Sequence, residues 1–146
     1  MTEREWTLIV QNHLSESITD NKNLAVKAFE RIPYALEIMG YSEQGEHDLR
    51  HMGYQTDLVV IENMDNDIWK PRVIIELKIN NVTTHDAITY SQKAFTHKTV
   101  HPYLRYGILL GNFRHYPLPG RLFRHGAHFD FMASWSDFNP SENELK

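Results

Sequence analysis

Two apolar stretches, residues 54–61 (YQTDLVVI) and 72–79 (RVIIELKI), decide the fold of this chain. Short runs of branched apolar side chains are typical of buried β-strands. The residues between them, 63–67 (NMDND), are rich in turn formers. We therefore predict two neighbouring strands that can pair as a hairpin.

Three charged residues interrupt these strands: Asp57 in the first, and Glu76 and Lys78 in the second. Side chains on a strand alternate between faces, so Glu76 and Lys78 share one face while Ile75 and Leu77 point into the core. A hairpin would bring Asp57 close to Glu76, and two such carboxylates attract a hard cation, Mg²⁺ or Mn²⁺. Lys78 would then lie beside a metal-bound water, which it could orient or deprotonate, or it could offset charge on a phosphate. The same spacing equally fits a surface Glu–Lys pair with Asp57 as a turn cap.

The rest of the pattern predicts an α/β domain with a mixed sheet flanked by helices. The first dozen residues form a short amphipathic helix. Leu24 to Met39 form a second helix, kinked at Pro33 and ended by Gly40. We further predict a short strand at 47–51, a helix from Thr84 to His97, a strand at 106–110, a loop at 113–127 and a late strand at 129–132. Residues 1–146 are read as a single domain, with an extension at 1–20, a core at 24–111 and a C-terminal loop and strand at 112–146.

Composition excludes several classes of protein. The chain has 146 residues, of which 41% are hydrophobic, which is enough for a packed core. It has no cysteine, which excludes disulfides, cysteine-bound zinc, iron–sulfur clusters and thiol catalysis. No stretch is apolar enough to span a membrane, and the N-terminus lacks the apolar core of a signal peptide, so we expect a cytoplasmic protein.

Charge is unevenly distributed along the chain, although its net value is only −4. Residues 1–86 hold eight Lys or Arg against fifteen Asp or Glu. Residues 87–129 hold six Lys or Arg, five of the nine histidines and no acid. We call residues 87–129 the basic block. An acidic half beside a basic half suits an enzyme that binds metal with one part and a polyanion with the other, although charge can also segregate by chance.

Asp57, eighteen intervening residues and then Glu76-Leu77-Lys78 resemble the signature of the PD-(D/E)XK nuclease superfamily. The resemblance covers roughly residues 24–111 and implies a restriction-endonuclease-like core, α-β-β-β-α-β. Ile32-Pro33-Tyr34 to Gly40-Tyr41, together with Gln92, are similar to N-terminal nuclease domains of type I restriction subunits. Thr56 stands where the family signature has proline.

The resemblance implies roles for individual residues. Asp57, Glu76 and the backbone carbonyl of Leu77 would bind the metal, and Lys78 would be the catalytic lysine. Gln92 would help to position the lysine, the water or the DNA backbone. The family often adds a glutamate from its first helix, for which Glu30 is preferred over Glu37, and Glu46, ahead of the first strand, is a third option.

The function that the resemblance implies is a metal-dependent nuclease acting on DNA, an endonuclease of a restriction, phage or defence system. A member that cuts both strands would act as a homodimer or within a larger assembly. Two alternatives stay open: a non-catalytic nucleic-acid-binding module on the same fold, and a protein–protein interaction domain.

Residues 114–126 (RHYPLPGRLFRHG) interleave cations with aromatic residues and contain no acid. Such a loop suits contact with phosphates and bases, although it also fits a surface loop pinned to the core by Leu122 and Phe123. The predicted DNA contacts are Lys93, Arg114, Arg121, Arg124 and His125. His97 and His101 have the i, i+4 spacing of a zinc site, but a cation at a helix end explains them better.

Overall fold

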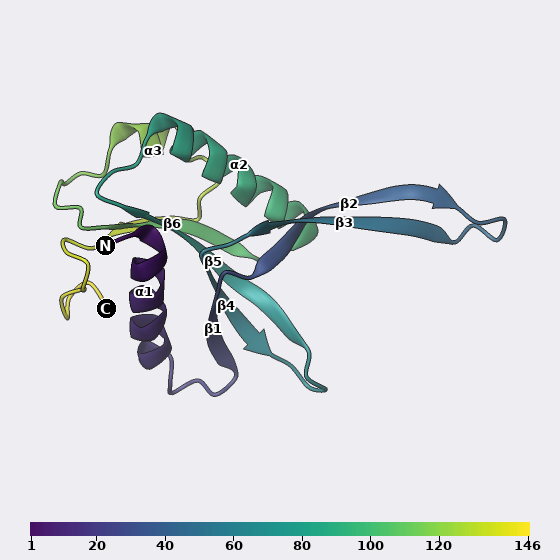
Figure 1. The fold of residues 1–146 in the computed structure, drawn as a ribbon, viewed down its shortest axis with the longest axis horizontal. Coiled ribbons are helices and arrows are strands. Elements are labelled where there is room, and N and C mark those ends of the chain that lie inside the picture. Colours follow the sequence, from purple (N-terminus) through teal and green to yellow (C-terminus); the bar gives the residue numbers. More distant parts are fainter.

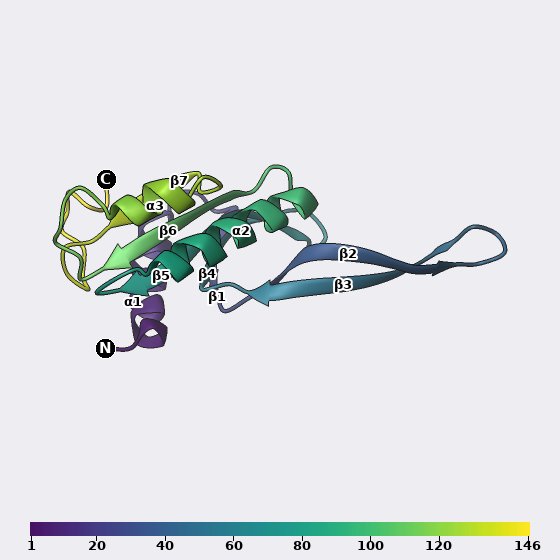
Figure 2. The same ribbon diagram turned by 90° about the horizontal axis from the view of Figure 1, so that it is seen from above.

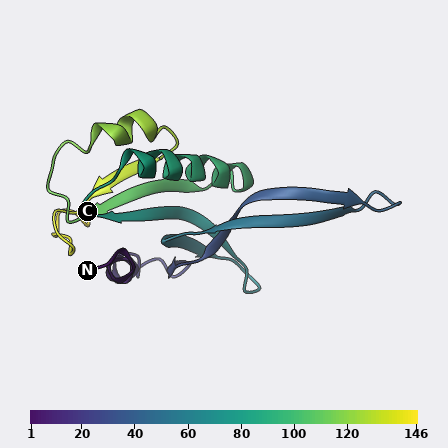
Figure 3. The ribbon, with the colours of Figure 1, turned by 45° about the horizontal axis from the view of Figure 1, so that its top comes forward.

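The computed structural model describes all of residues 1–146 and is built on a mixed five-stranded sheet with helices on both faces (Figures 1 and 3). The strands follow the order β1-β4-β5-β6-β7. Strands β1, β4 and β5 are antiparallel, whereas β5, β6 and β7 are parallel. Their bounds are β1 (Leu24–Ala28), β4 (Leu58–Asn63), β5 (Trp69–Ile79), β6 (Arg105–Gly111) and β7 (Phe131–Ser134). The predicted α/β class with a mixed sheet is confirmed.

Pairing of β4 with β5 confirms the predicted hairpin. Leu58 lies opposite Ile75, so these two side chains share one face, whereas Val59 and Ile74 lie opposite each other and pack in the core cluster on the other face. Ile75 and Leu77 are buried in the core cluster on the face of Leu58, as alternation predicts. Glu76 and Lys78 consequently point to the opposite face.

Helix α1 (Glu3–Ser17) covers the face that carries Ile75 and Leu77. It begins with a capping box, in which Thr2 and Glu5 bond to each other's backbone N–H groups. Trp6 is fully buried, and its indole N–H donates to the backbone oxygen of Phe138 at 2.9 Å. The helix therefore packs into the main core.

Helices α2 (Thr84–Val100) and α3 (Gly120–His125) lie side by side on the other face (Figure 3). Helix α2 begins with a second capping box, formed by Thr83 and Asp86, and Thr84 is its first helical residue. It ends at Val100, beyond the predicted end, and α3 occupies part of the segment predicted as a loop. None of the three helices has the length and apolarity needed to cross a membrane.

A two-stranded arm replaces the predicted helix at 24–39. Strands β2 (Arg31–Tyr41) and β3 (His47–Gln55) pair only with each other and project far from the body (Figure 2). The helical prediction is wrong because β1 pairs along its whole length with β4, and a turn with Phe29 at φ 59° separates β1 from β2. Pro33 lies at a register shift of β2 rather than at a helical kink.

Candidate active site

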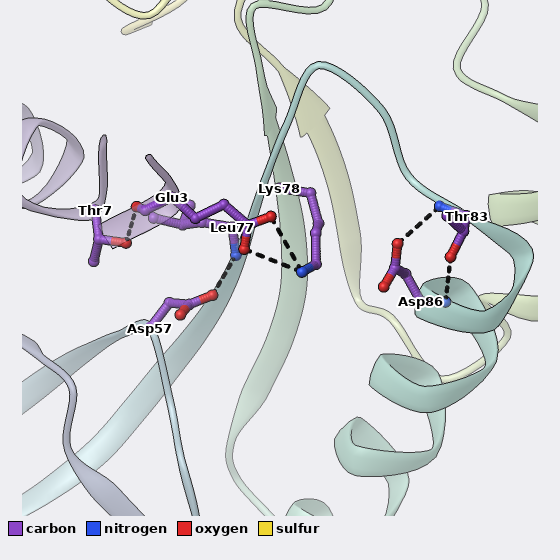
Figure 4. Close-up of polar contacts among 7 residues, drawn as sticks. All are labelled: Glu3, Thr7, Asp57, Leu77, Lys78, Thr83 and Asp86. Carbon is purple, nitrogen blue, oxygen red and sulfur yellow. Dashed lines mark hydrogen bonds and ion pairs between the residues drawn. The ribbon is translucent and has the colours of Figure 1, made fainter. Parts of the chain in front are cut away.

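Asp57 and Glu76 meet because of the β4–β5 register. Asp57 directly precedes Leu58, and Glu76 directly follows its partner Ile75, so both acids lie on the α2 face. The Asp57 carboxylate accepts a hydrogen bond from the Leu77 N–H at 2.8 Å (Figure 4). Glu76 is 2% exposed and accepts a hydrogen bond from the hydroxyl group of Tyr106 on β6. Both predicted acids therefore come together at the centre of the sheet.

The environment of Glu76 disfavours its charged form. Burial first, and then the negative charge of Asp57, raise the pKa of Glu76 to about 8, against the opposing effects of Tyr106 and Lys93. Burial and the Glu76 carboxylate also raise the pKa of the Tyr106 hydroxyl above its usual range. A divalent cation between Asp57 and Glu76 would relieve their repulsion.

Lys78 lies at the same end of β5, held between α1 and α2. Its ammonium is 3.1 Å and 3.3 Å from the two carboxylate oxygens of Glu3 (Figure 4) and 5.1 Å from the ring centre of Tyr90. Burial works against the charge, but the contacts with Tyr90 and Glu3 outweigh it and raise the pKa of Lys78 above its usual value. Lys78 is thus held as a cation, which favours charge stabilisation over the removal of a proton from water.

The first helix contributes Glu3, which the sequence analysis missed. The three glutamates proposed from the sequence lie elsewhere. Glu30 follows β1, Glu37 is in the middle of the arm, and Glu46 is in the loop at the tip of the arm, so none of them is on a helix. The Glu30 carboxylate pairs with Lys27 at 3.8 Å. The helical placement of Glu30 and Glu37 is wrong because the first helix is α1, not residues 24–39. The capping pattern that starts at Thr2 is the sequence signal that marks the beginning of α1.

Gln92 lies away from the site. It is exposed on α2 and forms no hydrogen bond with Asp57, Glu76 or Lys78. Residues two apart on a helix point about 200° apart, so Gln92 faces away from Tyr90. Tyr90 and Lys93 instead face the site, and the Lys93 ammonium is 4.9 Å from the Tyr90 ring centre. The α2 residues beside Lys78 and Glu76 are therefore Tyr90 and Lys93, not the predicted Gln92.

The other predicted DNA contacts lie on or near α3. Arg121, Arg124 and His125 are part of this helix, which packs beside α2 and carries no acid. Arg114 precedes it and is committed to an ion pair with Asp137. None of these four residues forms an ion pair or hydrogen bond with Asp57, Glu76 or Lys78.

His97 is neither a zinc ligand nor a helix-end cation. The ring is fully buried, with Nδ1 3.3 Å from the backbone oxygen of Pro33. Burial lowers the pKa of His97 to about 4, so it is neutral at physiological pH. Its Nε2 atom has no hydrogen-bond partner. His101 lies at the C-cap of α2, beyond the last helical turn.

The donor set fits a magnesium-type site. No group of three or more His, Asp or Glu side chains converges anywhere in the structure. Mg²⁺ does not need such a cage, because it usually takes one or two carboxylates and completes its shell with water and substrate phosphates. Asp57, Glu76 and the Leu77 carbonyl are the residues that would hold it.

Comparison with known proteins gives no further guide to identity. No family model matches the chain, and no curated protein is significantly similar to it in sequence.

Proposed function

We propose that this protein is a metal-dependent nuclease of the PD-(D/E)XK type, which hydrolyses phosphodiester bonds of DNA. The observation that carries the proposal is the convergence of Asp57 and Glu76, from two paired strands, beside a lysine held in its charged form. The element order also supports it. With the arm set aside, α1, β1, β4, β5, α2 and β6 follow the α-β-β-β-α-β order that the resemblance implies.

Each residue then has a defined task. Asp57, Glu76 and the Leu77 carbonyl hold Mg²⁺ or Mn²⁺. When bound, the cation supplies water of lowered pKa and neutralises charge on the phosphate. The Lys78 ammonium stabilises the negative charge that develops on the phosphate. Glu3 and Tyr90 position that ammonium.

The test is cleavage of supercoiled plasmid with Mg²⁺ or Mn²⁺, with EDTA as the metal-free control. We expect nicking by the wild type, and loss of at least a hundredfold in rate for Glu76→Gln and for Lys78→Ala. Glu62→Gln and Lys70→Ala are matched controls, because they alter a glutamate and a lysine on the same two strands at positions remote from the acid pair. Both controls should cut like the wild type. Cleavage that survives Glu76→Gln, or that ignores EDTA, would refute the proposal.

A non-catalytic DNA-binding module is the second candidate, because the hydrogen bond between Tyr106 and Glu76 also suits a structural carboxylic acid. This function predicts DNA binding that responds neither to Mg²⁺ nor to Glu76→Gln, together with no cleavage. Under the nuclease proposal, cutting both strands of a duplex calls for a homodimer or a larger restriction or defence assembly. The ratio of nicked to linear product tests this requirement.

A further inference from the structure

Lysine and tyrosine side chains alternate from the candidate active site to the base of the arm. The ammonium of Lys78 lies over the ring of Tyr90, which also faces Lys93 at 4.9 Å. The same Lys93 ammonium is 4.8 Å from the ring centre of Tyr54 on β3. Tyr54 in turn stacks on Tyr34 of β2, with ring centres 4.1 Å apart and planes 8° from parallel. We call these five residues the Lys–Tyr row.

The row ends in a groove between the arm and α2. Tyr34, Ala35 and Leu36 form one wall, and Thr96, Thr99 and Val100 form the other. No charged side chain lines this groove. The ring of Tyr34 can stack on the face of a nucleobase, and the hydroxyl oxygens of Thr96 and Thr99, whose protons are donated to the α2 backbone, can accept hydrogen bonds from its edge.

Lys93 supports a nucleotide as the ligand, because its ammonium group has no ion-pair partner. It forms no ion pair, whereas the neighbouring Lys98 on α2 is paired with Asp130 at 3.1 Å. A partly buried ammonium between two tyrosine rings, which senses the buried Glu76 carboxyl group but has no carboxylate within ion-pair distance, is available to a phosphate. If these residues served only to pack the arm against α2, the stacked tyrosine rings would be explained, but the position of the Lys93 ammonium between two of the rings would not.

We propose that the groove binds an unpaired nucleotide of the DNA strand, with its base against Tyr34 and its backbone following Lys93 toward Lys78. This inference rests on the proposed nuclease function and specifies its substrate class as DNA with single-stranded character beside the cut. In a paired duplex the bases are stacked on each other and present only their edges in the grooves, so Tyr34 has no base face to contact.

The test is fluorescence anisotropy with a short labelled single-stranded oligonucleotide and with a blunt duplex of the same sequence, both in EDTA. Tyr34→Leu removes the ring but keeps an apolar side chain, and we expect it to weaken single-strand binding about tenfold. Its effect on duplex binding should be less than about twofold. Tyr103→Leu is the matched control, because Tyr103 is 83% exposed and lies outside the groove and the Lys–Tyr row.

A second variant guards against misfolding of Tyr34→Leu. Thr99→Glu places a carboxylate at an exposed helical position on the groove wall, and it should also weaken single-strand binding severalfold. If both variants bind the single strand as the wild type does, the groove is not the site. Because binding is measured without metal, it is independent of cleavage. If the wild type does not cut plasmid, the nuclease proposal is refuted. If Tyr34→Leu and Thr99→Glu bind the single strand as tightly as the wild type does, the groove proposal is refuted.

Discussion

At the level of single residues, the carboxyl group of Glu76 opposes folding at neutral and alkaline pH. Its pKa is about 8 in the folded protein, well above the ordinary value of 4.5, so the folded state holds this proton more tightly than the unfolded chain. The resulting stabilisation is complete below about pH 4.5 and is lost as the pH rises through 8. Replacing Glu76 by a neutral side chain of the same shape should therefore stabilise the protein at pH values at which this carboxyl group is ionised in the unfolded chain, that is, above about 4.5.

We predict that Glu76→Gln raises the free energy of unfolding at pH 9 by several kcal/mol, about 5 at most, and changes it little at pH 4.5. Urea denaturation in EDTA at the two pH values measures the difference. Glu62→Gln, which alters an ion pair at the surface, should show no comparable gain at pH 9. Equal stabilisation at both pH values would mean that the amide side chain packs better than the carboxyl group for reasons unrelated to charge.

His97 makes the opposite contribution at acid pH. Burial, together with the nearby charges of His101 and Lys93, lowers its pKa to about 4, while the Pro33 carbonyl opposes the shift. The rings of Tyr34, Tyr54 and Tyr106 surround the rest of the imidazole. The unfolded chain therefore binds the proton more readily, and stability present above about pH 6.5 is lost as the pH falls toward 4.

We predict that the wild type loses up to about 3 kcal/mol of unfolding free energy between pH 6.5 and 4 through this residue. Glu76 adds stability as the pH falls through the same range, so the contribution of His97 is measured as the difference between two profiles. His97→Gln keeps a donor for the Pro33 carbonyl, and from pH 6.5 to 4 it should gain up to about 3 kcal/mol relative to the wild type, as measured by urea denaturation at a series of pH values. His115→Gln, at an exposed position, should leave the profile of the wild type unchanged. A profile that is equally steep in His97→Gln would assign the acid sensitivity to other groups.

The sequence predicts those site residues whose positions are determined by strand alternation and by the pairing of neighbouring strands. Glu76 and Lys78 lie on β5 and Asp57 directly precedes the paired strand β4, so strand alternation together with hairpin pairing was sufficient to bring them together. Glu3 and Tyr106 could not be found in this way, because α1 and β6 reach the site only through tertiary packing. Gln92 was expected at the site, but α2 packs on the sheet through its buried residues Ala87, Ala94 and His97, and this packing leaves Gln92 on the exposed side of the helix.

Among the elements, the arm shows why spacing alone was misleading. The apolar residues between 24 and 39 recur every three or four positions, which is typical of an amphipathic helix. In the structure Leu36 and Ile38 are each 51% exposed, so they are not the buried face of any element. The pairing of β1 with β4 replaces the helix, and the residues that follow β1 leave the body. Sequence periodicity assumes that apolar residues are buried, and the arm breaks that assumption.

The outer part of the arm should be dispensable for folding. Only its base contacts the body, where Ile32 packs in the core with Ala94 of α2. We predict that replacing residues 37–50 by Asn-Gly, which closes the hairpin between Leu36 and His51, changes the unfolding free energy by less than about 1 kcal/mol. Thermal denaturation followed by circular dichroism measures this change.

The same deletion removes Ile38, Met39, Tyr41 and Leu49, all of which are about half exposed or more. Exposed apolar strands favour association, so light scattering on heating should decrease in the shortened protein. A shortened chain that no longer unfolds cooperatively would show that the outer arm stabilises the body.

Across the whole molecule, part of the positive charge of the basic block lies on the face of the sheet that carries the candidate site. Of the six Lys and Arg in the basic block, Lys98 and Arg114 are paired with Asp130 and Asp137. Arg121 and Arg124 have no carboxylate partner and lie together on α3, beside α2 and on the same face of the sheet as Glu76 and Lys78 (Figure 3). A net charge of −4 therefore does not argue against a polyanionic ligand.

If this surface binds DNA, its affinity must fall steeply with salt, because each neutralised phosphate releases bound counterions. We predict that a plot of log K against log salt concentration becomes shallower by about two in Arg121→Gln/Arg124→Gln, since each contact contributes about 0.9 to the slope. Arg72→Gln is the matched control, because Arg72 is committed to Glu62 at 3.0 Å, and its slope should equal that of the wild type. If all three proteins give the same slope, α3 is not part of the DNA surface. If the wild type has no salt-dependent affinity, the basic block faces a protein instead, and the interaction-domain alternative gains support.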